Sequence, residues 1–138
     1  MAADRLTADS SVVVPALQDW HPLHKRAVAA IPNVRWVPAH VLAESFSTMT
    51  RMPPPRRTQP SMVLQQLSRA FPEMPVVLSA AGYLAVFRRL AAAGVAGGRV
   101  YDAIVAATAV EAGARLLSAD RRAVATYALV GADHELVE

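Results

Sequence analysis

Residues 99–120 read RVYDAIVAATAVEAGARLLSAD, and this stretch predicts a buried helix followed by a buried strand. Residues 100–112 are apolar on nearly every side of a helical wheel, and a helix with that pattern lies inside a protein core. Residues 114–117 form a short apolar run, which is typical of a strand within a sheet. A helix that leads into a buried strand is part of a βαβ unit, so this stretch favours a parallel sheet.

The same alternation of apolar runs and helical patterns continues along the rest of the chain. Strands or extended segments are expected at residues 5–9, 34–37, 75–78, 114–117 and 134–137. Helices are expected at residues 10–17, 22–31, 38–49, 61–71, 79–93, 100–112 and 121–129. Strands that alternate with helices indicate the α/β class. We therefore predict one α/β domain over residues 1–138, with a small and mostly parallel central sheet.

Composition excludes several classes of protein. Of the 138 residues, 54% are hydrophobic and 18% are charged, so the chain is too apolar for a disordered protein. No apolar run reaches the roughly 20 residues that span a bilayer, and MAADRLTADSS at residues 1–11 has no apolar signal-peptide core. The absence of cysteine excludes disulfides, thiol catalysis and thiolate zinc sites, and it fits a cytoplasmic protein.

The net charge of +3 comes almost entirely from arginine, because Lys25 is the only lysine among 14 basic residues. Arginine binds phosphate through its planar guanidinium fork, which suits a nucleic-acid partner. A general bias of the proteome toward arginine would give the same count, so charge alone does not decide this point.

Four of the 11 acidic residues lie within or at the end of apolar runs. Asp102 lies in the buried helix, where a carboxylate is costly unless it is paired or binds a metal. Alternatively, Asp102 stabilises the first turn through the helix dipole. Asp9 and Asp120 each follow a predicted strand and precede a predicted helix, the edge at which open α/β sheets bind ligands. Each of them could also be an ordinary helix cap.

Glu44 lies on the flank of the apolar face of its predicted helix, where a solvated surface acid also explains it. His40 lies one turn earlier and could hydrogen-bond this carboxylate or face solvent. Together, the four acids describe an oxygen-ligand site of the kind that Mg²⁺ or Mn²⁺ prefers. A metal there could activate water and neutralise charge on a phosphate, so phosphodiester hydrolysis is the reaction that suits the site best.

Four segments together resemble the PIN-domain nucleases, in particular the VapC-type toxins of bacterial toxin–antitoxin pairs. They are ADSSVV at 8–13, VLAE at 41–44, YDAIVAATA at 101–109 with Glu111 and Gly113, and LLSADRR at 116–122. The last two are the specific part of the resemblance, with Asp102 and Asp120 separated by eighteen positions (120 − 102).

The resemblance implies a three-layer α/β/α sandwich and an endoribonuclease that depends on Mg²⁺ or Mn²⁺. The acids of that family match Asp9, Glu44, Asp102 and Asp120, and its hydroxyl positions near the metal match Ser11 and Ser118. Ser118 stands where threonine is more usual, which keeps the hydroxyl. The resemblance also implies a homodimer and a cognate antitoxin that blocks the acidic pocket.

Arginines would have to hold the RNA beside these acids. Arg99 precedes Asp102 by three positions, and Arg121 and Arg122 follow Asp120, so all three are expected to border the pocket. Three more arginines, Arg51, Arg56 and Arg57, lie in the proline-rich segment 51–60 and could reach along the strand. Each of these arginines could instead be a solvated surface charge. The alternative function is a catalytically silent PIN-fold protein that binds RNA or a protein partner, and the presence of all four acids argues against it.

Overall fold

The computed structural model of the chain describes residues 5–138, so the first four residues of the predicted domain lie outside the described part. Three strands form one sheet in the order β1-β2-β3: β1 (Leu6–Ala8), β2 (Arg115–Ser118) and β3 (His134–Leu136). Both pairings are parallel, with Ala8 opposite Leu117 and Ser118 opposite Leu136. The predicted α/β class and the small parallel sheet are confirmed.

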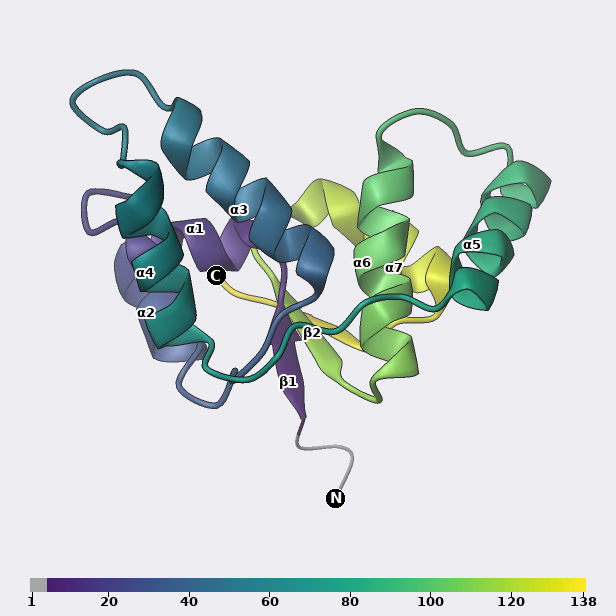
Figure 1. Cartoon of the computed structure of the whole chain (residues 1–138). Helices are drawn as coiled ribbons and strands as arrows, with labels where there is room; N and C mark the ends of the chain where they lie inside the picture. The colour runs from purple at the N-terminus through teal and green to yellow at the C-terminus, as the bar shows by residue number, and fades with distance from the viewer. Residues whose placement is uncertain (1–4) are drawn as a thin grey trace.

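Seven α-helices surround this sheet within the described residues. They are α1 (Ser10–Leu17), α2 (His24–Ala30), α3 (Ala39–Arg51), α4 (Pro60–Ala70), α5 (Ala80–Ala93), α6 (Arg99–Glu111) and α7 (Val124–Val130). A short 3-10 helix, η2 (Arg121–Ala123), precedes α7. Figure 1 shows α1, α2 and α4 on one side of the sheet and α5, α6 and α7 on the other, with α3 beside its upper end. The sheet is therefore the middle layer of three.

The core follows from the apolar runs that the sequence displays. Val12, Val13 and Leu116 are fully buried in the main core, which α1, α3, α4, α6 and the sheet share. A second, smaller core joins α5 to α6 around Val86 and Ile104. Within residues 5–138, none of the helices combines the length and apolarity that a membrane crossing requires.

The strand predicted at residues 75–78 is wrong. Val76 makes one isolated parallel bridge to Pro38, and the segment forms no ladder. Proline has no N–H to donate, so Pro38 cannot extend the pairing, and Pro75 limits it on the other side. The extended segment 34–37 also makes a single bridge, between Leu6 and Val34, and the Thr7 side chain donates to the Trp36 carbonyl 3.1 Å away.

Candidate active site

Asp9 lies directly after β1, at the carboxyl edge of the sheet, and is 5% exposed. It caps α1, because its Oδ1 accepts hydrogen bonds from the Ser11 amide at 3.0 Å and the Ser11 hydroxyl at 2.5 Å. Its Oδ2 accepts a hydrogen bond from the Tyr127 hydroxyl at 2.5 Å. Burial raises the pKa of Asp9, and these hydrogen bonds oppose the shift. Both the cap and the strand-end position predicted for Asp9 are therefore present.

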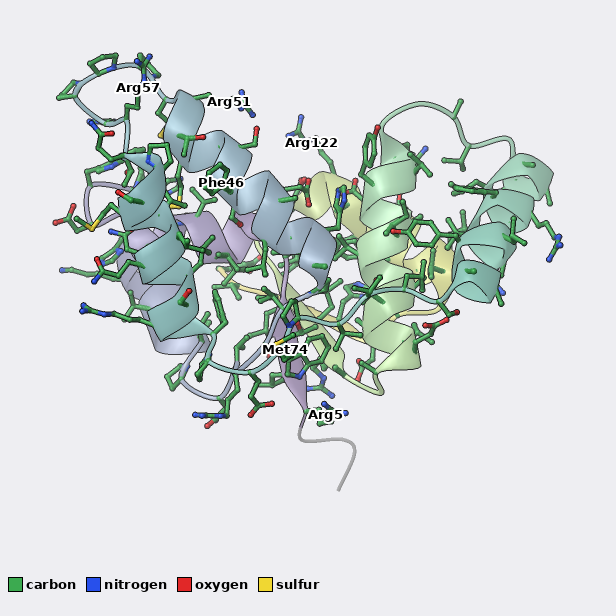
Figure 2. The ribbon with its side chains drawn as sticks, viewed as in Figure 1. Arg5, Phe46, Arg51, Arg57, Met74 and Arg122 are labelled. Atoms are coloured by element: carbon green, nitrogen blue, oxygen red, sulfur yellow. The ribbon has the colours of Figure 1, made fainter. Side chains whose placement is uncertain are left out.

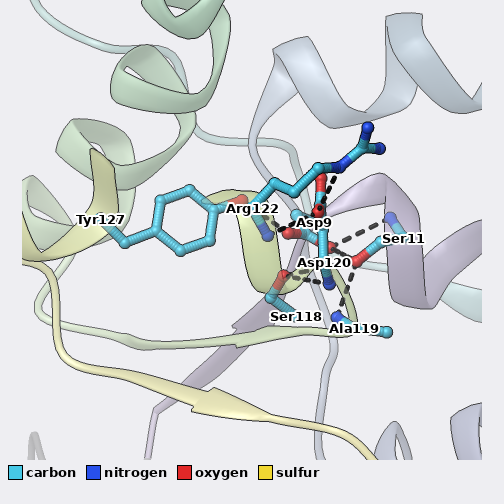
Figure 3. A network of polar contacts seen from close by, with 7 residues as sticks. All are labelled: Asp9, Ser11, Ser118, Ala119, Asp120, Arg122 and Tyr127. Atoms are coloured by element: carbon cyan, nitrogen blue, oxygen red, sulfur yellow. Dashed lines mark hydrogen bonds and ion pairs between the residues drawn. The ribbon is translucent and has the colours of Figure 1, made fainter. Parts of the chain in front are cut away.

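Two serine hydroxyls connect the ends of β1 and β2 (Figure 3). The Ser11 hydroxyl accepts from the Ala119 amide at 2.7 Å and lies 3.4 Å from the Ser118 hydroxyl. The Ser118 hydroxyl accepts from the Asp120 amide at 3.1 Å. The two predicted supporting serines thus hold the loop after β2, which leads into Asp120, against the start of α1.

Asp120 caps η2 through a hydrogen bond from the Arg122 amide to its Oδ1 at 3.0 Å. The Arg122 Nε lies 3.5 Å from the same oxygen. The Arg122 side chain is otherwise solvated, and Figure 2 shows it extending on the side of the molecule between α3 and α6. The same oxygen of Asp120 therefore caps η2 and pairs with the Arg122 side chain.

Asp102 and Glu44 reach the same region from two helices. Asp102 lies half-buried in the first turn of α6; burial raises its pKa, and Asp120 and Asp9 raise it further, whereas Arg99 and Arg122 lower it. Glu44 lies half-buried on α3, and burial, together with the charges of Asp102 and Asp9, raises its pKa to about 7. The charges of Asp9 and Asp102 thus act on Glu44, and those of Asp9 and Asp120 act on Asp102. We call Asp9, Glu44, Asp102 and Asp120 the acidic cluster.

The three predicted RNA-binding arginines have different surroundings. The Arg99 Nε donates to the Thr126 hydroxyl at 3.3 Å, which holds its side chain near α7. Arg121 forms an ion pair with Glu138. Arg99 and Arg122 both lower the pKa of Asp102. These two arginines are therefore the ones whose charge acts on the acidic cluster.

Sequence reasoning missed Tyr127 as a partner of the acidic cluster. Tyr127 lies on α7, is 1% exposed and contacts Asp9 across 118 positions of the chain. The only available signal was chemical, since a tyrosine within an apolar helix usually finds a partner for its hydroxyl. His40 lies one turn before Glu44 in the sequence, and the structure places its Nε2 3.7 Å from the Glu44 carboxylate.

The donor chemistry of the acidic cluster fits a divalent cation. Neighbouring acids raise the pKa of Glu44 and of Asp102, and a positive ion between such carboxylates would relieve their repulsion. Mg²⁺ and Mn²⁺ favour oxygen ligands. Across residues 5–138, no three His, Asp or Glu side chains are arranged to hold a metal directly. Mg²⁺ commonly keeps several waters and binds through one or two carboxylates. The arrangement therefore fits an ion bound partly through water.

Comparison with known proteins gives a consistent picture over nearly the whole chain. Residues 7–129 match the PIN domain family. Ribonuclease VapC40 of Mycobacterium tuberculosis, from strain CDC 1551 / Oshkosh and from strain H37Rv, is 39% identical over 132 residues, which cover 96% of this chain and 98% of that protein. Ribonuclease VapC27 of strain H37Rv is 36% identical over 127 residues, which cover 91% of this chain and 92% of that protein.

Proposed function

The chain belongs to the PIN-domain family, among the VapC-type ribonucleases, and from this premise we propose that it cleaves RNA at the acidic cluster with Mg²⁺ or Mn²⁺. The observation that supports this proposal is electrostatic: acids from four separate segments are linked, because Asp102 and Asp9 raise the pKa of Glu44, and Asp120 and Asp9 raise the pKa of Asp102. Asp9, Asp102 and Asp120 would hold the metal, partly through water molecules, with Glu44 completing its shell or orienting the attacking water.

The residues of the chain have distinct parts in the proposed reaction. A bound divalent ion would supply an activated water and neutralise charge on the phosphate. The Glu44 carboxylate would orient the attacking water or accept its proton. Arg99 and Arg122 would hold the phosphate against the repulsion of the acids, and Ser11 and Ser118 keep Asp9 and Asp120 in place.

Membership of the VapC group also supports two partners. We infer a cognate antitoxin that covers the acidic cluster, and a homodimer of this chain. Restored growth when the antitoxin is co-expressed with this protein would test the first.

A cytoplasmic location follows from an RNA substrate and is part of the same proposal. Fractionation of cells that express a tagged chain would test it.

Purified protein should cleave RNA when Mg²⁺ or Mn²⁺ is present, and EDTA should stop the reaction. The Asp102→Asn substitution keeps the size of the side chain but removes its charge. Changes in residues that only support metal ligands cost about 10–100-fold, so this variant should lose at least about 100-fold in rate. Gel analysis of labelled RNA over time measures both effects.

The matched control is Asp19→Asn, which removes an exposed acid outside the acidic cluster and should leave the rate unchanged. Cleavage at full rate in EDTA would contradict the metal mechanism, and full activity of Asp102→Asn would remove this residue from the site. Binding of RNA without any cleavage in either metal would instead support the catalytically silent alternative.

A further inference from the structure

One face of α3 carries a row of polar side chains beside the acidic cluster. Its members are His40, Glu44, Ser47, Thr48 and Arg51. Their spacings of four, three, one and three positions bring them onto the same side of a helix. This row is separate from the buried face of α3, which packs into the main core. A polar face that includes Glu44 is therefore available to a ligand along most of α3.

An aromatic pair lies at one end of this row. The rings of His40 and Tyr101 are stacked, with centroids 5.3 Å apart and planes inclined by 4°. Burial lowers the pKa of His40, which favours the neutral ring. Tyr101 directly precedes Asp102 and is 52% exposed, so a large part of its ring is open to a ligand.

The polar row and the aromatic pair line one hollow of about 340 Å³ between α3 and the start of α6. Besides the row itself, Ala43 and Tyr101 line it. We call this hollow the α3 groove. Arg51, at the C-terminal end of α3, supplies its cation, and Figure 2 shows Arg51 and Arg122 extending on the same side of the molecule.

These features together match the way in which proteins bind single-stranded nucleic acid. Such sites combine aromatic rings on which bases stack with cations that follow the phosphates. Hydroxyl groups such as those of Ser47 and Thr48 can hydrogen-bond a ribose 2′-OH. In a duplex the bases are stacked inside the helix, so a duplex offers no base to the ring of Tyr101.

We propose that the α3 groove is a nucleotide subsite for single-stranded RNA, in which a base stacks on Tyr101, supported by His40, and a phosphate binds Arg51. This inference rests on the proposed ribonuclease function. It adds the path that the RNA strand takes past Glu44. It makes Tyr101 a substrate-binding residue and the stacked pair a positioning element for the scissile phosphate.

The aromatic part is tested by binding of a short single-stranded RNA to the Asp120→Asn variant, which should bind without cutting and keeps the helix cap. Adding Tyr101→Leu should weaken binding about tenfold, because stacking of one base is worth about five- to a hundredfold in affinity. Tyr101→Phe keeps the ring and should restore affinity to within about twofold. A duplex of the same sequence should bind more weakly than the single strand.

The matched control is Phe46→Leu, which changes an exposed aromatic residue on another face of α3, where it lines a separate cavity with Leu64. It should leave RNA affinity unchanged. Equal affinity of the Tyr101→Leu and parent proteins would overturn the proposal, and so would a duplex that binds as tightly as the single strand. Thermal unfolding of each variant confirms that the compared proteins are folded.

The cationic part is tested by a salt series on the same complex. Each phosphate contact of a single strand contributes about −0.7 to the slope of log affinity against log salt. Arg51→Gln should flatten the slope by about that amount, whereas Arg69→Gln, an exposed arginine on α4, should not change it. An unchanged slope for Arg51→Gln would remove Arg51 from the subsite.

Failure of this inference is distinguishable from failure of the proposed function. If the wild-type protein cleaves RNA with Mg²⁺ and the Tyr101→Leu variant binds and cleaves equally well, the subsite is wrong and the ribonuclease function stands. If the wild-type protein cleaves no RNA in either metal, the proposed function is wrong, whatever the binding series shows.

Discussion

Glu44 is the acid of the cluster whose protonation changes near neutral pH. Its pKa is raised from 4.5 to about 7, first by burial and then by Asp102 and Asp9. Between these two values, the folded protein keeps a proton on Glu44 that the unfolded chain has released. Stability therefore falls as the pH rises through this window, and the full cost is present above pH 7.

We expect Glu44→Gln to remove this pH dependence when no divalent ion is present. At about pH 8 the variant should be more stable than the wild type by about 1–2 kcal/mol, a value discounted because the side chain is 35% exposed. At about pH 4.5 the two proteins should differ little. Urea unfolding across this range, in EDTA, measures the effect. The control is Glu135→Gln on the exposed side of β3, and equal stability of Glu44→Gln and wild type at pH 8 would contradict the prediction.

At the scale of secondary structure, prediction from sequence succeeded where a pattern is local. The buried helix α6 was predicted at 100–112 and is found at Arg99–Glu111, because its apolar residues identify it without reference to any partner. The segment 75–78 looked equally apolar but forms no strand, since a strand also needs a neighbour with free donors. Local composition does not reveal that neighbour.

The same distinction applies to the site. Asp9 and Asp120 could be located because both follow strands of a parallel sheet, whose carboxyl ends meet at one edge. The contact between Tyr127 and Asp9 could not, because it depends on how α7 packs over the end of β1. The stacking of His40 on Tyr101 likewise depends on the placement of α3 against α6.

Tyr127 is the polar link between α7 and the end of β1. Tyr127→Phe keeps the buried ring but leaves Asp9 Oδ2 without its donor, so we expect a loss of about 1–3 kcal/mol in the free energy of unfolding. Chemical denaturation at neutral pH measures the loss. The control is Tyr83→Phe on α5, whose ring packs against the smaller core, and it should cost much less. An equal effect of the two substitutions would show that the Asp9 contact contributes nothing.

At the scale of the whole molecule, a net positive charge coexists with a local group of acids. The chain carries +3, with 14 basic residues against 11 acids, yet four of those acids form the acidic cluster. A net positive charge attracts a polyanion such as RNA at long range, whereas the acidic cluster repels it at short range.

The homodimer that we infer should appear as a particle of twice 14.7 kDa. Large apolar side chains remain exposed in the isolated chain, among them Leu64, Met74, Leu84 and Phe87, and exposed apolar surface of this kind is typical of protein interfaces. Light scattering during size-exclusion chromatography, over a dilution series, measures the mass. A constant mass of one chain at every concentration would contradict the dimer.

The pairing of β1 with β2 also has a consequence for synthesis on the ribosome. Strand β1 is synthesised long before its ladder partner, which begins only at Arg115, and Asp120 and Tyr127 follow still later. A nascent chain that stops before residue 115 therefore carries three acids of the cluster and no strand to hold Asp9 beside them. Because contacts this distant in sequence form late, the acidic cluster stays unassembled until β2 and Asp120 have been synthesised.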